Sequence, residues 1–249
     1  IEVADLTTAQ LATLVKNFDI IKLVSTTRPI RIRPGLLGDV RREYGFEVVV
    51  EDDLPVVAII DTGVSAIQPL RDLFSGIRYD HTGTGANWDE NGHGTMVAGL
   101  VALGDNFPSE VSTSYHAKAK LAVIKVIKGD NDSIDIPKLL NDIRDAKRTH
   151  GVRLFNMSLT LGITKPYNAA FCSFAYELDK LAFEEDILII MAVGNYDGID
   201  LENLIAPGHH PSHDYPRFFY DLNSTSPDHK CWYTNIMEPS ESLNNISIG

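Results

Sequence analysis

The chain has 249 residues, of which 44% are hydrophobic and 22% are charged. This length and composition suit one large α/β domain, or one domain with a small appendage. The formal net charge of −12 is opposite in sign to the basic surface that nucleic acids bind, so we expect no nucleic-acid partner. No apolar run approaches the ~20 residues of a membrane helix, so we expect no membrane contact of that kind.

Residues 1–50 are predicted to form a small lead-in unit, and residues 51–249 the main domain. Thr7 and Gln10 have the spacing of a capping box. The apolar residues that follow, Leu11, Leu14 and Val15, predict a short helix, and residues 20–24 predict a strand.

Two blocks near the start of the main domain carry acid–base side chains. The apolar run at residues 56–60 is typical of a strand covered on both faces, and it ends at Asp61. Sites in open α/β sheets form at this end of the strands. His93 lies between Gly92 and Gly94, before a helix predicted over residues 95–103. An aspartate that orients a histidine, and a histidine that takes a proton, are two members of a nucleophile-activating triad.

The segments around these blocks are polar. Residues 65–90 are predicted to be irregular, with His81 solvated in a loop. Asp89 and Glu90 are predicted to lie in a solvated loop, the alternative being that they favour basic side chains in a ligand. Residues 104–118 are predicted to be a loop.

The second half of the chain alternates strands and helices. Strands are predicted over residues 121–126 and 187–193. One helix is predicted from an apolar stripe with Pro137 in its first turn, and another from a stripe around Leu178. Residues 196–244 lack clear periodicity and are predicted to form an insertion that rims the site. The stripes are Ile136, Leu139, Leu140, Ile143 and Ala146, and Phe174, Leu178, Leu181 and Ala182.

The motifs Asp61-Thr62-Gly63 and His93-Gly94-Thr95, in this order, resemble the aspartate and histidine motifs of the subtilisin-like serine peptidases. Residues 152–160 resemble the family strand that pairs with extended substrate. There Ser158 and Leu159 align, and Thr160 replaces the usual glycine. Residues 192–195, Ala-Val-Gly-Asn, resemble the family segment whose asparagine donates to the oxyanion, and residues 244–249 resemble the family strand that follows the oxyanion segment.

The resemblance implies a three-layer α/β fold with a mostly parallel central sheet. It also offers an alternative for residues 1–50, the tail of a pro-segment or inhibitory domain. It implies a serine endopeptidase that acts on a protein or peptide substrate through an Asp-His-Ser triad. Asp61, His93 and Asn195 would be catalytic, and Ser158, Leu159 and Thr160 would bind substrate.

The nucleophile of this family lies in a Gly-Thr-Ser motif, and these three residues occur nowhere in succession in the chain. We therefore expect the chain to represent the first two thirds of a catalytic domain, truncated before the serine-bearing helix. We expect it to be inactive alone, with the missing segment in further domains of a parent chain or in another chain.

Two alternatives to an active serine peptidase stay open. The first is a non-catalytic subtilisin-like fold used for binding or regulation. The second is a metal-dependent hydrolase that combines Asp61 and His93 with the His/Asp cluster at residues 209–214, whose spacing matches no known ligand signature. We expect no metal ion and no cofactor.

The cysteines and the compartment are less determined. Cys172 and Cys231 are either free thiols or one disulfide. The compartment stays unknown, with low cysteine use favouring a cytoplasmic over a secreted location.

Overall fold

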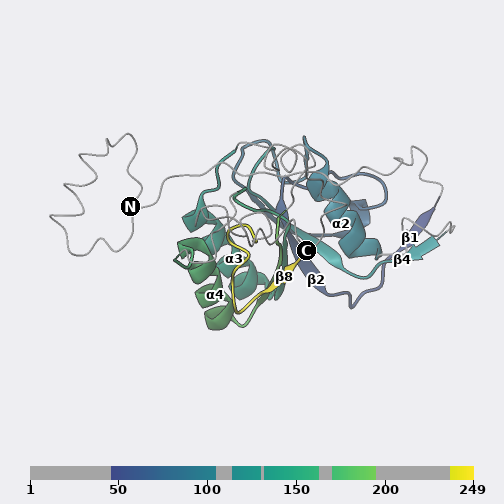
Figure 1. The fold of residues 1–249 in the computed structure, drawn as a ribbon. Helices are drawn as coiled ribbons and strands as arrows, with labels where there is room; N and C mark the ends of the chain where they lie inside the picture. The colour runs from purple at the N-terminus through teal and green to yellow at the C-terminus, as the bar shows by residue number, and fades with distance from the viewer. Residues whose placement is uncertain (1–45, 105–113, 130–131, 163–169, 195–235) are drawn as a thin grey trace, which may run out of the picture.

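The computed structural model describes residues 46–104, 114–129, 132–162, 170–194 and 236–249. At its centre is a six-stranded sheet whose neighbouring strands all run parallel, in the order β3-β5-β2-β6-β7-β8 (Figure 1). This confirms the predicted α/β class with a mostly parallel sheet. The strands are β2 (Val56–Asp61), β3 (Phe74–Asp80), β5 (Lys120–Lys125), β6 (Leu154–Met157), β7 (Leu188–Ala192) and β8 (Ile246–Ile248).

Three helices of the described part cover the two faces of this sheet. Helix α2 (His93–Leu103) lies on one face, and α3 (Ile136–His150) and α4 (Ser173–Glu185) lie on the other (Figure 1). Successive side chains of a strand point to opposite faces. Accordingly, Ala58 and Ile60 of β2 join the core under α3 and α4, whereas Ile59 joins the core under α2. The result is the three-layer arrangement that the resemblance implied.

Helix α3 forms where the apolar stripe predicted it, and its ends have clear local causes. The side chain of Asp135 accepts the backbone N–H of Lys138 at 3.0 Å, which satisfies one of the donors exposed at a helix start. Pro137 occupies the first turn, where its missing N–H has no partner to lose. Gly151 ends the helix with a φ of 72°, a conformation that glycine adopts readily.

Two stretches that were predicted to be irregular contain strands. The prediction for residues 65–90 is wrong, because β3 lies at the edge of the sheet and follows a short 3₁₀ turn at Arg71–Leu73. None of the residues of β3 is fully buried, and its register shifts between Phe74 and Arg78. An edge strand of this kind lacks the continuous apolar run by which β2 was predicted. The prediction for residues 104–118 misses β4 (Ser114–His116), which pairs in parallel with β1 (Glu47–Val49).

Other predicted boundaries need small corrections. The strand predicted over residues 152–160 is β6, which ends at Met157, and the strand predicted over 187–193 is β7. Helix α2 begins at His93, two residues before the predicted start.

Most of the predicted lead-in unit lies outside the described residues. Of residues 1–50 only 46–50 are described; within them Val48 and Val50 pack against the core under α2. The division at residue 50 stays a prediction. In the described ranges, no helix combines the length and the apolar character that crossing a bilayer requires.

Asp179 of α4 holds the segment that leads into the last strand. Its carboxylate accepts the backbone N–H groups of Leu243 at 2.9 Å and Asn244 at 2.8 Å, and the hydroxyl of Ser242. These bonds bring β8 beside β7, so the predicted strand at residues 244–249 is confirmed. Residues 195–235, most of the predicted insertion, lie outside the described part.

We predict a pH-dependent contribution from the pair that joins α3 to α4. Arg148 donates to Glu185 at 2.6 and 3.0 Å, and this bond, opposed by burial, keeps the pKa of Glu185 below its ordinary value of 4.5. The stability that a lowered carboxyl pKa provides is present above the unfolded-state value and is lost as the pH falls through the folded-state value. Glu185→Gln should therefore lower Tm by roughly 2–4 °C at pH 7.

The difference between Glu185→Gln and the wild type should shrink as the pH falls below 4.5, as followed by circular dichroism melts. Glu184→Gln is the matched control, because Glu184 is exposed and its nearest pairing, with Lys180, is at 4.0 Å. A Glu185→Gln melt that matches the wild type at pH 7 would contradict the assignment.

Candidate active site

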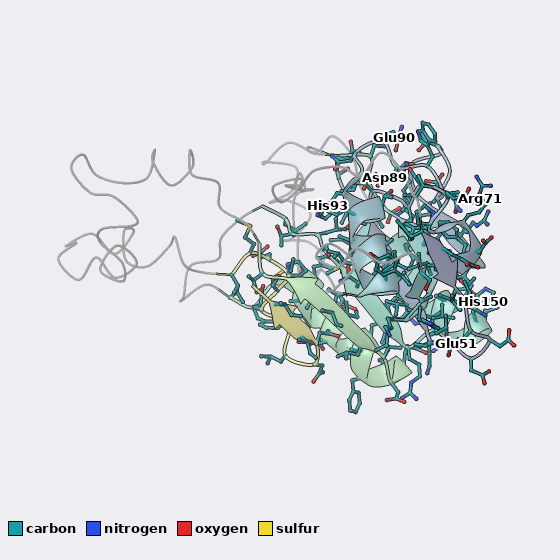
Figure 2. All side chains as sticks on the ribbon, turned by 90° about the vertical axis from the view of Figure 1, so that its right-hand side faces the viewer. Glu51, Arg71, Asp89, Glu90, His93 and His150 are labelled. Carbon is teal, nitrogen blue, oxygen red and sulfur yellow. The ribbon has the colours of Figure 1, made fainter. Side chains whose placement is uncertain are left out.

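The two predicted acid–base residues meet at the carboxyl edge of the sheet. Asp61 is the last residue of β2, and His93 is the first residue of α2. Nδ1 of His93 lies 2.8 Å from Oδ1 and 3.0 Å from Oδ2 of Asp61. Figure 2 shows His93 at the same end of the molecule as Asp89 and Glu90, opposite the end at which Glu51 and His150 lie. The structure therefore brings together the two residues that the sequence places 32 positions apart.

The surroundings of this contact determine which of its two groups is the hydrogen-bond donor. Asp61 has no exposed surface and His93 is buried. An ionised carboxylate can only accept hydrogen bonds, so Nδ1–H of His93 is the donor. The Asp61 carboxylate also accepts the backbone N–H of Thr62 at 2.8 Å and its hydroxyl at 3.2 Å. Holding the proton on Nδ1 fixes the tautomer in which Nε2 carries the lone pair, the form required of a general base.

Glycines allow the helix to approach the aspartate loop. A Cβ on Gly94 would lie 2.1 Å from the carbonyl oxygen of Gly63 and 3.0 Å from Cβ of Asp61. The N–H of Gly94 donates to the hydroxyl of Thr62 at 3.1 Å, so the two motifs are bonded to each other by backbone as well as by side chains. Any side chain at position 94 would push α2, and His93 with it, away from β2.

The predicted substrate-binding residues follow the neighbouring strand. β6 pairs directly with β2, with Met157 beside Ile60, so Ser158, Leu159 and Thr160 continue from the same edge of the sheet as Asp61. The hydroxyl of Ser158 donates to the side-chain oxygen of Asn156 at 2.8 Å, and Leu159 and Thr160 are buried. Their role in binding stays a prediction.

Gly194 ends the described part of the segment predicted to stabilise the oxyanion, and Asn195 lies outside the described residues. Sequence reasoning missed Met237, which lies between this segment and Thr160. Its sulfur accepts the Thr160 hydroxyl at 3.4 Å, and a Cβ on Gly194 would lie 2.4 Å from the same atom.

Asp89 and Glu90 lie in a loop as predicted, with Asp89 half-buried and Glu90 exposed, but both carboxylates are bonded within the protein. The carboxylate of Asp89 accepts the backbone N–H groups of Gly92 and Thr95, both at 2.8 Å, and the hydroxyl of Thr95 at 2.6 Å. It thus satisfies donors at the start of the histidine helix. Glu90 pairs with the buried Lys125. The sequence offered one signal for the role of Asp89, because an acidic residue a few positions before a predicted helix is typical of a helix start.

The prediction of a solvated His81 is also wrong. Its side chain is 5% exposed, and Nε2 lies 2.7 Å from Oδ2 of Asp142 on α3. Asp142 is 61 residues away in the chain, so no local sequence pattern indicated that the His81 side chain is buried.

One group of donor side chains in the described part has a spacing that could hold a metal ion. Sγ of Cys172 and carboxylate oxygens of Glu238 and Glu241 lie within 4.8 Å of one another. A thiol must lose its proton to bind a metal. Burial raises the pKa of Cys172, and the two carboxylates raise it further. Cys172 is a free thiol.

We predict that Gly94→Ala destabilises the fold by about 1–3 kcal/mol or more, because the added methyl would collide with backbone. Gly99→Ala, five residues along the same helix, is the matched control. Nothing lies within 4 Å of a Cβ at that position, and alanine in a helix is better than glycine by about 0.5–1 kcal/mol. Urea unfolding measures both. Equal effects of the two substitutions would contradict the close approach of α2 to β2.

Comparison with known proteins identifies a family. A model of the subtilase family, peptidase S8, matches residues 52–230. The cell wall-associated protease of Bacillus subtilis (strain 168) is 36% identical over 112 residues, which are 42% of this chain and 12% of that protein.

Two solved structures cover 78% of this chain. MycP1 with its N-terminal propeptide removed has 19% identity and a TM-score of 0.45, over 56% of its own length. A lanthipeptide protease has 16% identity and a TM-score of 0.45, over 48% of its length. The chain thus spans 12% to about half of the lengths of these relatives. Since the family model covers most of the chain, including both acid–base motifs, the chain belongs to the subtilase family.

Proposed function

We propose that the chain carries the acid–base pair and part of the substrate groove of a serine endopeptidase. The observation that supports this most strongly is the buried contact between Asp61 and His93 at the carboxyl edge of a parallel sheet. Membership of the subtilase family gives the chemistry in which such a pair serves. The reaction is hydrolysis of a peptide bond through an acyl-enzyme.

In this proposal His93 moves the proton in both halves of the reaction. It takes the proton of the serine hydroxyl as the oxygen attacks the peptide carbonyl, and then gives it to the leaving amine. Water attacks the acyl-enzyme by the same route in reverse. Asp61 orients the imidazole and stabilises its charged form, and it keeps its own charge throughout.

The remaining predicted site residues act on the substrate. Ser158, Leu159 and Thr160 would present backbone groups to an extended peptide, in continuation of β6. Asn195 would donate its side-chain amide to the oxyanion, a contribution of about 10²–10³ in turnover. Thr160 in place of glycine would narrow this groove. The ligand is therefore a protein or peptide, and the net charge of −12 speaks against a nucleic acid.

The nucleophilic serine is the part of the triad that these 249 residues do not supply in its family motif. We propose that this chain alone hydrolyses no peptide bond, and that activity requires a Gly-Thr-Ser segment from a longer parent chain or a second chain. The same sequence feature supports the alternative, a non-catalytic subtilisin-like fold that binds or regulates. Retention of Asp61 and His93 in bonded geometry favours the catalytic proposal, because binding alone does not require it.

We predict no cleavage of a fluorogenic peptide library by the 249-residue chain. In a longer protein that joins this chain to a Gly-Thr-Ser segment, His93→Ala should lower kcat by on the order of 10⁶ and Asp61→Asn by on the order of 10⁴, as in triads already measured, subtilisin among them. Thr95→Ser keeps a hydroxyl for Asp89 beside the site and serves as the control. Peptide cleavage that survives His93→Ala, or that a chelator abolishes, would contradict the proposal.

A further inference from the structure

Lys125 is a fully buried cation that the proposed mechanism does not use. It is the last residue of β5, and it ranks among the largest side chains with no exposed surface. Lys125 lies directly beside Asp61 in the sheet register, and the residues two positions earlier in their strands, Val123 and Ile59, join the core under α2. The two side chains therefore point to the same face. A buried ammonium without acceptors is strongly unfavourable, so its partners matter.

In the described part of the chain, Nζ of Lys125 donates to residues 84–90, the segment that leads into the histidine helix. Nζ donates to the hydroxyl of Thr84 at 2.8 Å, to the carbonyl of Trp88 at 2.5 Å, and to the carboxylate of Glu90. Burial raises the pKa of Glu90, but the hydrogen bonds from Lys125 and Thr84 outweigh it and keep this pKa below its ordinary value. Glu90 is therefore ionised at neutral pH.

The same segment bonds to the start of α2. Asp89 lies between Trp88 and Glu90, which both bond to Lys125. Its carboxylate accepts the backbone N–H groups of Gly92 and Thr95. The hydroxyl of Thr95 in turn accepts the N–H of Ser65, in the loop that follows Asp61. A closed circuit of hydrogen bonds thus runs from β5 through residues 84–90 to α2 and back to the end of β2. Figure 2 shows Asp89, Glu90 and His93 together at this end of the molecule.

We propose that Lys125 is a positioning residue of the candidate active site, which fixes residues 84–90 and so holds His93 against Asp61. The bonds of His93 to Asp61 and of Gly94 to Thr62 both join the helix start to the end of one strand, β2. The circuit through Lys125 gives the helix start a second, independent attachment to the sheet. The catalytic meaning of this role rests on the proposed function of His93. The positioning itself does not, because it is a matter of geometry alone.

The test uses ¹⁵N-labelled 249-residue chain and measures hydrogen exchange of the Gly94 and Thr95 amides, together with the low-field proton signal of His93 Nδ1–H. In Lys125→Met these two amides should exchange about tenfold faster or more, because the helix start opens locally. The His93 signal should broaden or vanish, a change that a general loss of stability does not produce. Amides of α4 should keep their rates.

Lys120→Met is the matched control, since Lys120 opens the same strand and its Nζ reaches an exposed carbonyl, that of Asp52. It should leave both readouts unchanged. If Lys125→Met does not fold, Glu90→Gln is the deciding variant. The Glu90 side chain is partly exposed, so this substitution should be tolerated, and it weakens the same hydrogen-bond circuit. It should change both readouts in the same direction as Lys125→Met.

A folded variant whose helix start and His93 signal match the wild type would overturn the proposal. So would equal acceleration in α2 and α4, or an equal effect of Lys120→Met. No readout depends on peptide cleavage, so a chain that proves to be non-catalytic could still confirm or refute the role of Lys125.

Discussion

Asp61 is a carboxylate without exposed surface at the end of a buried strand. A charge in this position is stable only with several donors around it. Thr62 supplies two and His93 supplies a third. The parallel sheet places the strand end there, and Gly94 lets the histidine helix come close enough to reach it. The arrangement of α2 against β2 therefore follows from the requirement to satisfy this one buried charge.

The parts of the site that sequence could predict are those set by local pattern. A continuous apolar run predicted β2. The motifs that identified Asp61 and His93 lie at the end of this strand and at the start of α2. Helix α3 was predictable from its stripe and its proline. The fold class followed from strands alternating with helices, a pattern that favours a parallel sheet covered on both faces.

The parts that could not be predicted depend on partners far away in the chain. β3 is stabilised by pairing with β5, and its own sequence is too polar to predict a strand. His81 is buried because α3 brings Asp142 to it. A lysine at the end of an apolar strand is a signal of an acidic partner, but only the folded chain identifies Glu90 as that partner. Each of these contacts joins segments 35 or more residues apart, so no local window contains both sides.

The central proposal is that His93 activates the serine nucleophile of a peptidase. Intact mass after reaction with a fluorophosphonate probe tests it most directly. We predict that the 249-residue chain keeps its mass of 27.5 kDa without an adduct. A longer protein that contains this chain and a Gly-Thr-Ser segment should gain one adduct on that serine, and His93→Ala should abolish it. An adduct on the 249-residue chain, or one that forms equally well without His93, would contradict the account.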